Sequence, residues 1–317
     1  MKKLTTLFTA CTLAAGALLS SCSQMDTNAA AATQPSYVAM ETNSGRILYA
    51  SNSNTRRPIG MLTNIATSVV ALDWIKARGI DMNMQLTVPA AATLWPRTNL
   101  LHLQAGDRIS LRDALHSAIM WDDSVCATTI AHACGSGIDS SDPEGAFVSQ
   151  MNQLARTIGM KATRFKGSNG AIISTSSARD MALLGMYAIE NPAFQAICSQ
   201  PRYTATINGT RTQDIINSNT LLSTSAHVDG VRAARSANAG ACLVASAKRA
   251  SVKRINPRTG QQATYAQRLL VVILGMPTSR ERYRIASELL RDGWGAWDEW
   301  QKADDFADPT KFIILPN

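Results

Sequence analysis

The spacing of apolar residues predicts helices in the first two thirds of the chain. After Pro58, apolar positions recur every three to four residues, which predicts a helix over residues 61–76 that packs on one side: Leu62, Ile65, Val69 and Leu72. Residues 107–190 are also expected to be mainly helical. The boundary signals there are a capping box at Ser110–Asp113 for a helix through Met120, a stop at Gly159, and a start at Ser177–Asp180 for a helix that ends before Asn191.

A β-hairpin is expected at the beginning of the folded part. Residues 37–41 and 46–50 have strand-like composition and flank Thr42–Gly45. The residues between them are Thr, Asn, Ser and Gly, which favour turns because they accept unusual backbone angles or bond their own backbone. The hairpin therefore precedes the first predicted helix.

Strand signals return near the end of the chain. Residues 241–247 and 269–274 are apolar runs of strand length, and we expect a basic loop, 248–267, to join them. A last helix is predicted over 279–290, with Gly293 beyond it. Strands, a helical insertion, strands again and a closing helix indicate a single α+β domain, with an antiparallel sheet flanked by helices and a mainly helical lobe.

The N-terminus carries an export signal rather than a membrane span. Two lysines precede an apolar stretch over residues 4–19, and Leu19-Ser20-Ser21-Cys22 resembles the bacterial lipobox. This pattern predicts a lipoprotein signal peptide at residues 1–21 and a lipid on Cys22; the alternative is an ordinary signal peptide with a chance cysteine. Residues 22–36 are small and polar, as in a tether. The Ser at position 23 favours the outer membrane over the inner one under enterobacterial sorting rules, so we expect a lipid-anchored envelope protein that faces the periplasm.

Charge narrows the class of partner only slightly. The 317 residues include 31 Lys and Arg against 23 Asp and Glu, a formal net charge of +8. A protein with this balance tolerates anionic wall polymers and lipid surfaces, and we expect no nucleic-acid partner. Five cations between positions 248 and 258 are open to two interpretations, a contact with wall polymer or lipid headgroups, or a solvated loop: Lys248, Arg249, Lys253, Arg254 and Arg258.

Four cysteines remain after the signal peptide and the lipidated residue are set aside. Cys126, Cys134, Cys198 and Cys242 allow one or two disulfides in an oxidising compartment, or act as small buried apolar residues. Cys126 and Cys134 are eight residues apart on a predicted helix, about 12 Å by helical rise, which is too far for a bond between them. No ligand spacing in the sequence indicates a metal, and no cofactor is expected.

Several separated stretches of the sequence carry a resemblance to one family. They are Arg56–Pro58, Gly106–Asp107, Leu111–Leu115, Met151–Asn152, Gly159–Met160, Phe165, Ser168–Gly170, Ser174–Leu183, Asn219–Leu222 and Val228–Val231. In these stretches the chain resembles peptidase family S11, the serine-type D-alanyl-D-alanine carboxypeptidases or low-molecular-weight penicillin-binding proteins. The resemblance covers roughly 37–295, which leaves 296–317 as a C-terminal extension, and it implies a β-lactamase/transpeptidase-like fold.

The first catalytic motif of the family is substituted at both functional positions. The resemblance implies Ser-x-x-Lys at the start of the first helix, where this chain has Met61 and Asn64. Residues three apart share a helix face, so a Lys there can take the proton of the Ser hydroxyl. A thioether cannot form an acyl ester, and an amide is no base near neutral pH.

The second and third motifs are also altered. The family's Ser-x-Asn corresponds to the stretch with Asp122 and Ser124, and its Lys-Thr-Gly corresponds to Arg232, Ala233 and Ala234. The third motif keeps a cation, and an arginine side chain can bind a terminal carboxylate with two hydrogen bonds. Arg232 is therefore the expected ligand-binding residue, while the hydroxyl and the glycine are lost.

Other arrangements of reactive residues are weaker. Ser68, Ser124 and Ser177 are not followed by a lysine three positions later, so none of them restores the first motif. A new triad of Ser124, His227 and Asp229 is conceivable from their places in the sequence. Asp122 and Asp123 suggest either a cation site or a helix start. The remaining histidines have no surrounding motif, and a structural role is favoured for each: His102, His116 and His132.

Two functional hypotheses follow. The first is a catalytically inactive envelope lipoprotein of this family. It either binds peptidoglycan stem peptides or a cell-wall enzyme, or binds nothing in its cleft and is a structural or interaction module. The second is an active carboxypeptidase or other hydrolase that uses displaced residues. Loss of the nucleophile of a serine hydrolase costs on the order of a millionfold in rate, and loss of the base about as much, so the sequence favours the inactive protein.

Overall fold

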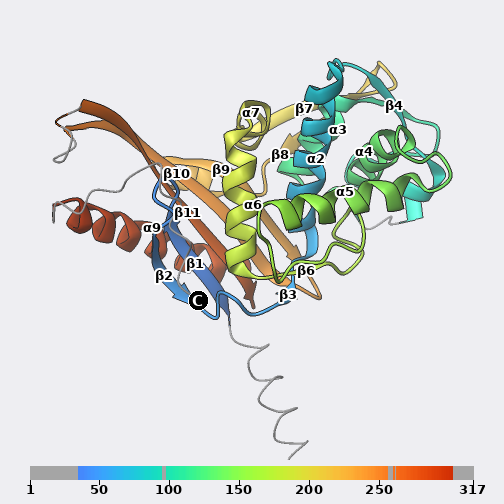
Figure 1. Cartoon of the computed structure of the whole chain (residues 1–317). Coiled ribbons are helices and arrows are strands. Elements are labelled where there is room, and N and C mark those ends of the chain that lie inside the picture. The colour runs from blue at the N-terminus through green and yellow to red at the C-terminus, as the bar shows by residue number, and fades with distance from the viewer. Residues whose placement is uncertain (1–34, 95–97, 256–259, 261, 303–317) are drawn as a thin grey trace, which may run out of the picture.

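A five-stranded antiparallel sheet lies at the centre of the structure (Figure 1). The computed structural model describes residues 35–94, 98–255, 260 and 262–302, so the expected signal peptide, Cys22 and most of the tether lie outside the described residues. The strand order is β2-β1-β11-β10-β9. The strands are β1 Ser36–Glu41, β2 Ile47–Ser51, β9 Val228–Ser236, β10 Gly240–Ile255 and β11 Gln262–Met276.

Side chains of this sheet alternate between two apolar layers. Along β11, Leu270, Val272 and Leu274 belong to the larger core, which they share with the helical lobe. Leu269, Val271 and Ile273 point to the other face, where Trp294 and Trp297 of the last helix pack. Since successive residues of a strand face opposite sides, a strand buried on both faces has a continuous apolar sequence. Figure 1 shows α9 (Ser279–Lys302) on one side of the sheet and α6 (Ala178–Glu190) with the helical lobe on the other.

The helical lobe has the elements that the apolar spacing predicts. The helix expected over 61–76 begins as a 3₁₀ turn, η1 Gly60–Leu62, continues as α2 Thr63–Arg78, and ends at Gly79, whose φ is 62°. The Ser110 and Ser177 side chains accept the backbone N–H of Asp113 and Asp180, which confirms both predicted helix starts. The other helices are η2 Ala90–Leu94, α3 Leu111–Met120, α4 Ser124–Ser136, α5 Pro143–Thr157, α6 Ala178–Glu190, α7 Pro192–Cys198 and α8 Leu221–Thr224.

Two smaller sheets complete the lobe. A four-stranded sheet has the order β4-β5-β7-β8, and its β7–β8 hairpin was not predicted. A two-stranded pair, β3 with β6, holds the chain that enters η1 against the segment that enters α6. The strands are β3 Arg57–Pro58, β4 Gln85–Thr87, β5 Arg108–Ser110, β6 Thr175–Ser176, β7 Arg202–Ile207 and β8 Arg211–Ile216.

The expected basic loop at 248–267 is wrong. Strands β10 and β11 continue to pair from Lys248 with Arg268 out to Ile255 with Gln262, so this segment is a two-stranded ribbon that extends beyond the rest of the sheet. Lys248, Arg249 and Lys253 lie on β10, whereas the side chain of Arg254 and the whole of Arg258 are outside the described residues. Few residues of the ribbon are buried, which explains why no apolar pattern marked it as strand.

The last helix is longer than predicted. Helix α9 runs from Ser279 to Lys302 and passes through Gly293, which was expected to lie beyond its end. Trp294 and Trp297 are 6% and 5% exposed against the sheet, and their burial stabilises the turns after the glycine. The helix therefore also crosses position 295, where we expected the family domain to end.

All four cysteines of the described region are free and buried. The disulfides that the sequence allowed are absent among these residues, and the alternative of small buried apolar side chains agrees with the structure. In the part of the chain that the structure describes, no helix is both long and apolar enough to cross a bilayer. No cluster of three or more His, Cys, Asp or Glu suited to a metal ion occurs there either.

A pocket at the start of the first helix

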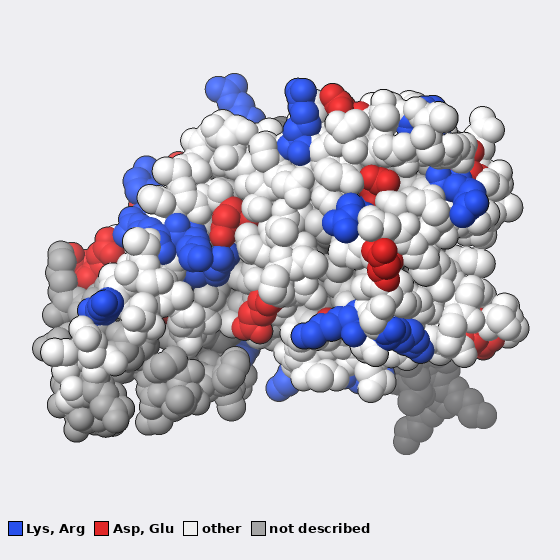
Figure 2. Space-filling model, turned by 90° about the horizontal axis from the view of Figure 1, so that it is seen from above, with Lys and Arg blue, Asp and Glu red and all other residues white. Residues whose placement is uncertain are grey.

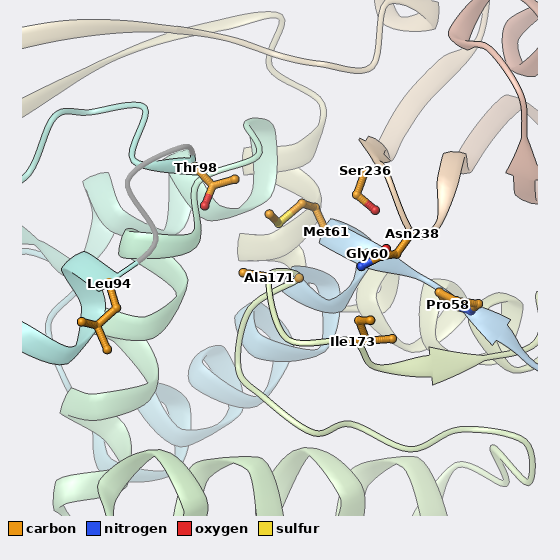
Figure 3. Close-up of a pocket in the computed structure, with 10 residues that line it drawn as sticks. Pro58, Gly60, Met61, Leu94, Thr98, Ala171, Ile173, Ser236 and Asn238 are labelled. Carbon is orange, nitrogen blue, oxygen red and sulfur yellow. The ribbon is translucent and has the colours of Figure 1, made fainter.

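A pocket of about 340 Å³ opens beside the N-terminal end of η1 and α2 (Figure 3). Its lining comes from four separate parts of the chain and includes no charged residue: Pro58, Gly60, Met61, Leu94, Thr98, Gly170, Ala171, Ile173, Ser236 and Asn238. Sequence reasoning identified only Met61 among them as a site residue. The others are small, apolar or amide side chains, and only the chain's path in three dimensions brings them together.

Met61 occupies the position at which the family resemblance implies a nucleophile. Its side chain extends into the pocket in Figure 3 but is only 4% exposed. The Ser124 hydroxyl, itself fully buried, lies 3.6 Å from the Met61 sulfur. Gly170 packs so closely on the backbone of Met61 that a Cβ there would lie 2.4 Å from its Cα. The turn is therefore held tightly, with a thioether where the predicted reaction needs a hydroxyl.

Asn64 is buried behind Met61 and does not reach the pocket. Its amide nitrogen donates to the backbone carbonyls of Ala118, at 3.2 Å, and Asp123, at 3.4 Å. The amide oxygen has no hydrogen-bond partner in the structure. Asn64 thus ties α2 to the C-terminal end of α3 and offers no basic group.

Arg232 lies inside the protein and differs from its expected role. Its side chain is fully buried, so it cannot receive a substrate carboxylate from solvent. Nε donates to the Met61 carbonyl at 2.8 Å, Nη1 to the carbonyls of Ala118 and Ile119 at 2.6 and 2.5 Å, and Nη2 to the Trp121 carbonyl at 2.8 Å. The guanidinium therefore joins β9, η1 and the end of α3, and the sequence-based expectation of carboxylate binding is corrected by this burial.

Asp122 supplies the counter-charge to Arg232. Its Oδ1 accepts from Nη2 of Arg232 at 3.0 Å, and its side chain is 29% exposed. Desolvation raises the pKa of Asp122, and the positive charge of Arg232 partly opposes that rise. Burial lowers the pKa of Arg232 in turn, which the same carboxylate opposes. The pair is an internal connection between the second and third motif positions.

Asp123 is the N-cap of α4. Its carboxylate accepts the backbone N–H of Cys126 at 2.9 Å and those of Leu100 and Leu101 at 3.2 Å, together with the Ser117 hydroxyl. These contacts support the helix start, the second of the two interpretations given above for the adjacent acids.

The Ser124, His227 and Asp229 triad is not assembled. Ser124 contacts Met61, whereas Asp229 forms a two-pronged ion pair with Arg268 at 2.8 and 3.0 Å. His227 is an exposed residue with φ of 72° in the turn before β9. A base and a nucleophile must lie within hydrogen-bonding reach of each other, and Ser124 and Asp229 are each engaged with another residue.

The remaining histidines have structural surroundings. His116 is buried, stacks on Tyr203 with ring centroids 3.5 Å apart, and its Nδ1 lies 2.7 Å from the Arg112 carbonyl. Burial lowers its pKa. His102 lies in a turn with φ of 52°, and His132 lies on α4 away from the pocket lining.

The two alanines of the third motif are packed into the sheet. Ala233 is fully buried in the layer under α9, and Ala234 is 3% exposed in the larger core. The carbonyl of Ala234 accepts from Nη1 of Arg282 at 2.8 Å. Arg282, which sequence reasoning missed, is therefore a second buried cation that fixes strand β9; no local signal marked it in the sequence.

Comparison with known proteins gives the family. The chain matches Peptidase S11, the D-alanyl-D-alanine carboxypeptidase family, over residues 23–257. It is 30% identical over 251 residues to a D-alanyl-D-alanine carboxypeptidase of Streptomyces sp. strain K15, covering 74% of this chain and 84% of that one. It is also 30% identical to DacC of Escherichia coli K12, where it covers 82% of this chain but spans only 60% of the relative.

Solved structures agree with this fold. The Streptomyces K15 DD-transpeptidase superposes with a TM-score of 0.71 at 23% identity, over 84% of this chain and 97% of that chain. DacD of Francisella tularensis superposes with a TM-score of 0.66 at 22% identity, over 81% of this chain and 69% of that chain. The α+β, transpeptidase-like architecture predicted from the sequence is confirmed, and the chain belongs to peptidase family S11, the D-alanyl-D-alanine carboxypeptidases.

Proposed function

We propose that this chain is a catalytically inactive member of the family. The observation that carries the proposal is the side chain that faces the pocket at position 61: a thioether that contacts the buried hydroxyl of Ser124 at 3.6 Å. Neither group has a base beside it that would generate a nucleophile. Two hydroxyl residues line the pocket, Thr98 and Ser236, but the lining that the structure describes contains no Lys, His, Asp or Glu that would act as a base on either of them.

The residues at positions 61, 64 and 232 all point to the same loss of catalysis. With Met at 61 and an amide at 64, both the acyl acceptor and the base are missing, and each loss alone costs on the order of a millionfold in rate. The buried Arg232 fills the space between β9 and α3 and donates to four main-chain carbonyls. Restoring one catalytic side chain would therefore leave the others and their hydrogen bonds in place.

The retained role that we propose is recognition of a peptidoglycan stem peptide or of a cell-wall enzyme. The pocket has an uncharged lining, so contacts to a peptide would be apolar contacts and hydrogen bonds to uncharged groups, with no cation for a terminal carboxylate. Titration calorimetry with a synthetic stem pentapeptide tests this, with Ile173→Asp as the matched variant, because Ile173 lines the pocket and is 45% exposed. If the wild type does not bind the pentapeptide, a stem peptide is excluded as the ligand and the cell-wall enzyme remains as the proposed partner.

The test of inactivity is intact-mass spectrometry after incubation with excess penicillin, with an active family member treated in parallel. We expect no adduct on this chain under conditions that label the active protein fully. A stoichiometric adduct would contradict the proposal, and peptide mapping would then identify the nucleophile.

We propose further that the protein is a lipoprotein of the bacterial envelope, faces the periplasm and is carried by the outer membrane. The support is the sequence Leu19-Ser20-Ser21-Cys22, which lies outside the described residues. Mass spectrometry of the membrane-extracted protein is expected to show an N-terminal diacylglyceryl cysteine at position 22. The Cys22→Ala variant should lose the lipid and leave the membrane fraction, and an unmodified Cys22 would contradict the assignment.

A further inference from the structure

A second and larger pocket, of about 740 Å³, lies at the C-terminal end of α5 and is separate from the one at Met61. Four of its lining residues are basic and none is acidic: Arg56, Arg156, Lys161 and Arg164. The rest of the lining is Ser149, Asn152, Gly159, Met160, Thr163 and Phe165. We call this cavity the basic pocket. It has no role in the function proposed above.

The four cations have no ion-pair partners in the part of the chain that the structure describes. All four are exposed, and among them only Arg56 makes a side-chain hydrogen bond, from Nε to the Ala162 carbonyl at 2.9 Å. Elsewhere the surface is mixed: on the face in Figure 2, Lys and Arg side chains are interspersed with Asp and Glu. Four like charges around one cavity repel one another, and a bound anion relieves that repulsion.

The backbone of the basic pocket is held by partly buried hydrogen bonds. Asn152 of α5 donates to the Phe165 carbonyl at 2.9 Å and accepts the Phe165 N–H at 3.0 Å. Asp180 of α6 accepts the N–H of Ala162 and the hydroxyl of Thr163, both at 2.7 Å. The segment that carries Lys161 and Arg164 is thus fixed from two sides, and its cations are presented on a rigid frame, which lowers the entropy that ligand binding costs.

The carboxylate of Asp180, which contacts this frame, is already engaged in hydrogen bonds. Asp180 is 4% exposed and its oxygen accepts from the frame itself, so it does not neutralise the pocket's cations through a direct contact. Arg156 lies in the last turn of α5, where the negative end of the helix dipole stabilises a positively charged side chain. That position explains one cation of the four, and the other three lie on non-helical segments.

We propose that the basic pocket binds a small ligand that carries two or more phosphate groups. Three guanidinium groups offer planar pairs of donors that match phosphate oxygens, and the lysine adds a point charge. A cavity of this size accommodates a diphosphate or a phosphorylated sugar rather than a single ion. A soluble phosphate ester and a phospholipid headgroup share this chemistry.

The test is a calorimetric titration of the purified protein with pyrophosphate, at low and at physiological salt. The pocket variant is Arg156→Gln with Arg164→Gln, and the matched control is Lys76→Gln with Arg280→Gln. Lys76 and Arg280 are exposed and outside the pocket lining, so the control removes the same net charge. The wild type should bind one pyrophosphate, and the pocket variant should lose at least about tenfold in affinity. The control should lose less than about twofold, because the distant charges are screened.

Equal losses in the two double variants would overturn the proposal, since binding would then follow net charge alone. No saturable binding to the wild type, or tighter binding of citrate than of pyrophosphate, would also overturn it. Co-sedimentation with vesicles that contain cardiolipin, whose headgroup carries two phosphates, separates the two sources of phosphate. Vesicle binding that pyrophosphate competes away and the pocket variant loses identifies a headgroup; pyrophosphate binding without vesicle binding identifies a soluble ester. Unchanged thermal midpoints of both variants exclude unfolding as the cause.

Discussion

Nε of Arg232 donates a hydrogen bond of 2.8 Å to the main-chain carbonyl of Met61. This bond connects the positions that the family resemblance assigns to the third and first motifs, which are 171 residues apart in the sequence. The same guanidinium bonds three carbonyls of the α3 end and the carboxylate of Asp122. A buried cation with all of its donors engaged is a structural connection. It turns the position that the family resemblance assigns to ligand binding into part of the core.

Replacement of Arg232 should therefore destabilise the fold. In Arg232→Met the buried carbonyls that it bonds lose their donor and Asp122 loses its counter-ion, so we expect a loss of about 3–5 kcal/mol in the free energy of unfolding. Urea denaturation of the wild type and the variant measures this difference in the free energy of unfolding. Arg202→Ala is the control: its ion pair with Asp214 is exposed, and we expect a change within about 0.5 kcal/mol. Similar losses in the two variants would show that the contacts of Arg232 contribute little.

Position 64 should tolerate an apolar residue better than the family's lysine. The Asn64 amide and Nη1 of Arg232 both donate to the Ala118 carbonyl, so Asn64→Lys places a second cation beside a buried one. We expect a loss of about 3 kcal/mol or more for Asn64→Lys, because an unpaired buried charge is costly. Asn64→Leu should lose less, about 1–2 kcal/mol, since the amide oxygen it removes already lacks a partner.

Thermal and urea unfolding of the two Asn64 variants give the comparison. The same lysine in a Met61→Ser background should not restore labelling by penicillin, because Arg232 still occupies the site. Equal stability of Asn64→Lys and wild type, or labelling of the double variant, would contradict this account of the pocket.

His116 should make stability depend on pH below neutrality. The imidazole of the unfolded chain titrates near 6.5, and burial lowers its pKa in the folded protein. Between these two values the unfolded chain binds more protons, so the stabilisation is complete above 6.5 and is lost as the pH falls through the folded pKa. One proton gives a slope of at most about 1.4 kcal/mol per pH unit.

The difference in unfolding free energy between wild type and His116→Phe isolates this effect. Phenylalanine keeps a ring to stack on Tyr203 and does not titrate. The difference should be constant near pH 8 and should shift in favour of the variant as the pH is lowered. A difference that does not vary with pH would show that His116 is not the titrating group.

Part of the fold could be predicted because its sequence pattern is strong. The helix after Pro58 has a buried face of Leu62, Ile65 and Val69, and helices α3 and α6 have serine caps whose bonds the structure contains. The β7–β8 hairpin lacked such a pattern. Ile215 is buried in it but Ile216 is 58% exposed, so apolar and polar positions do not alternate clearly.

The site was harder to predict than the fold. The resemblance predicts which positions are substituted, but a sequence gives no distance between Arg232 and the carbonyls of Ala118 and Trp121. Arginine is rarely fully buried, so an exposed binding role was the natural prediction. The burial follows from contacts with segments more than 110 residues away along the chain.

The cysteines should react only after unfolding. Burial raises the pKa of Cys134 to about 12 and that of Cys242 to about 11, so little thiolate forms at pH 8. Iodoacetamide should leave the four thiols of the described region unmodified in the native protein and alkylate all of them in urea without a reductant: Cys126, Cys134, Cys198 and Cys242. Peptide mapping counts the modified sites. A pair that stays unmodified in urea until reductant is added would reveal a disulfide.

The ribbon of β10 and β11 has open strand edges, which favour association between copies of this protein. In the described part of the chain, pairing with β9 ends near Ala247 and pairing with β1 ends near Leu269, so both edges of the ribbon beyond these points keep backbone groups for a further strand. Open edges of this kind recruit identical strands from other molecules. Lys248 and Lys253 are exposed along the ribbon, and their like charges hold a second copy away. We therefore expect self-association of the protein to increase when salt screens these lysines or acetylation removes their charge.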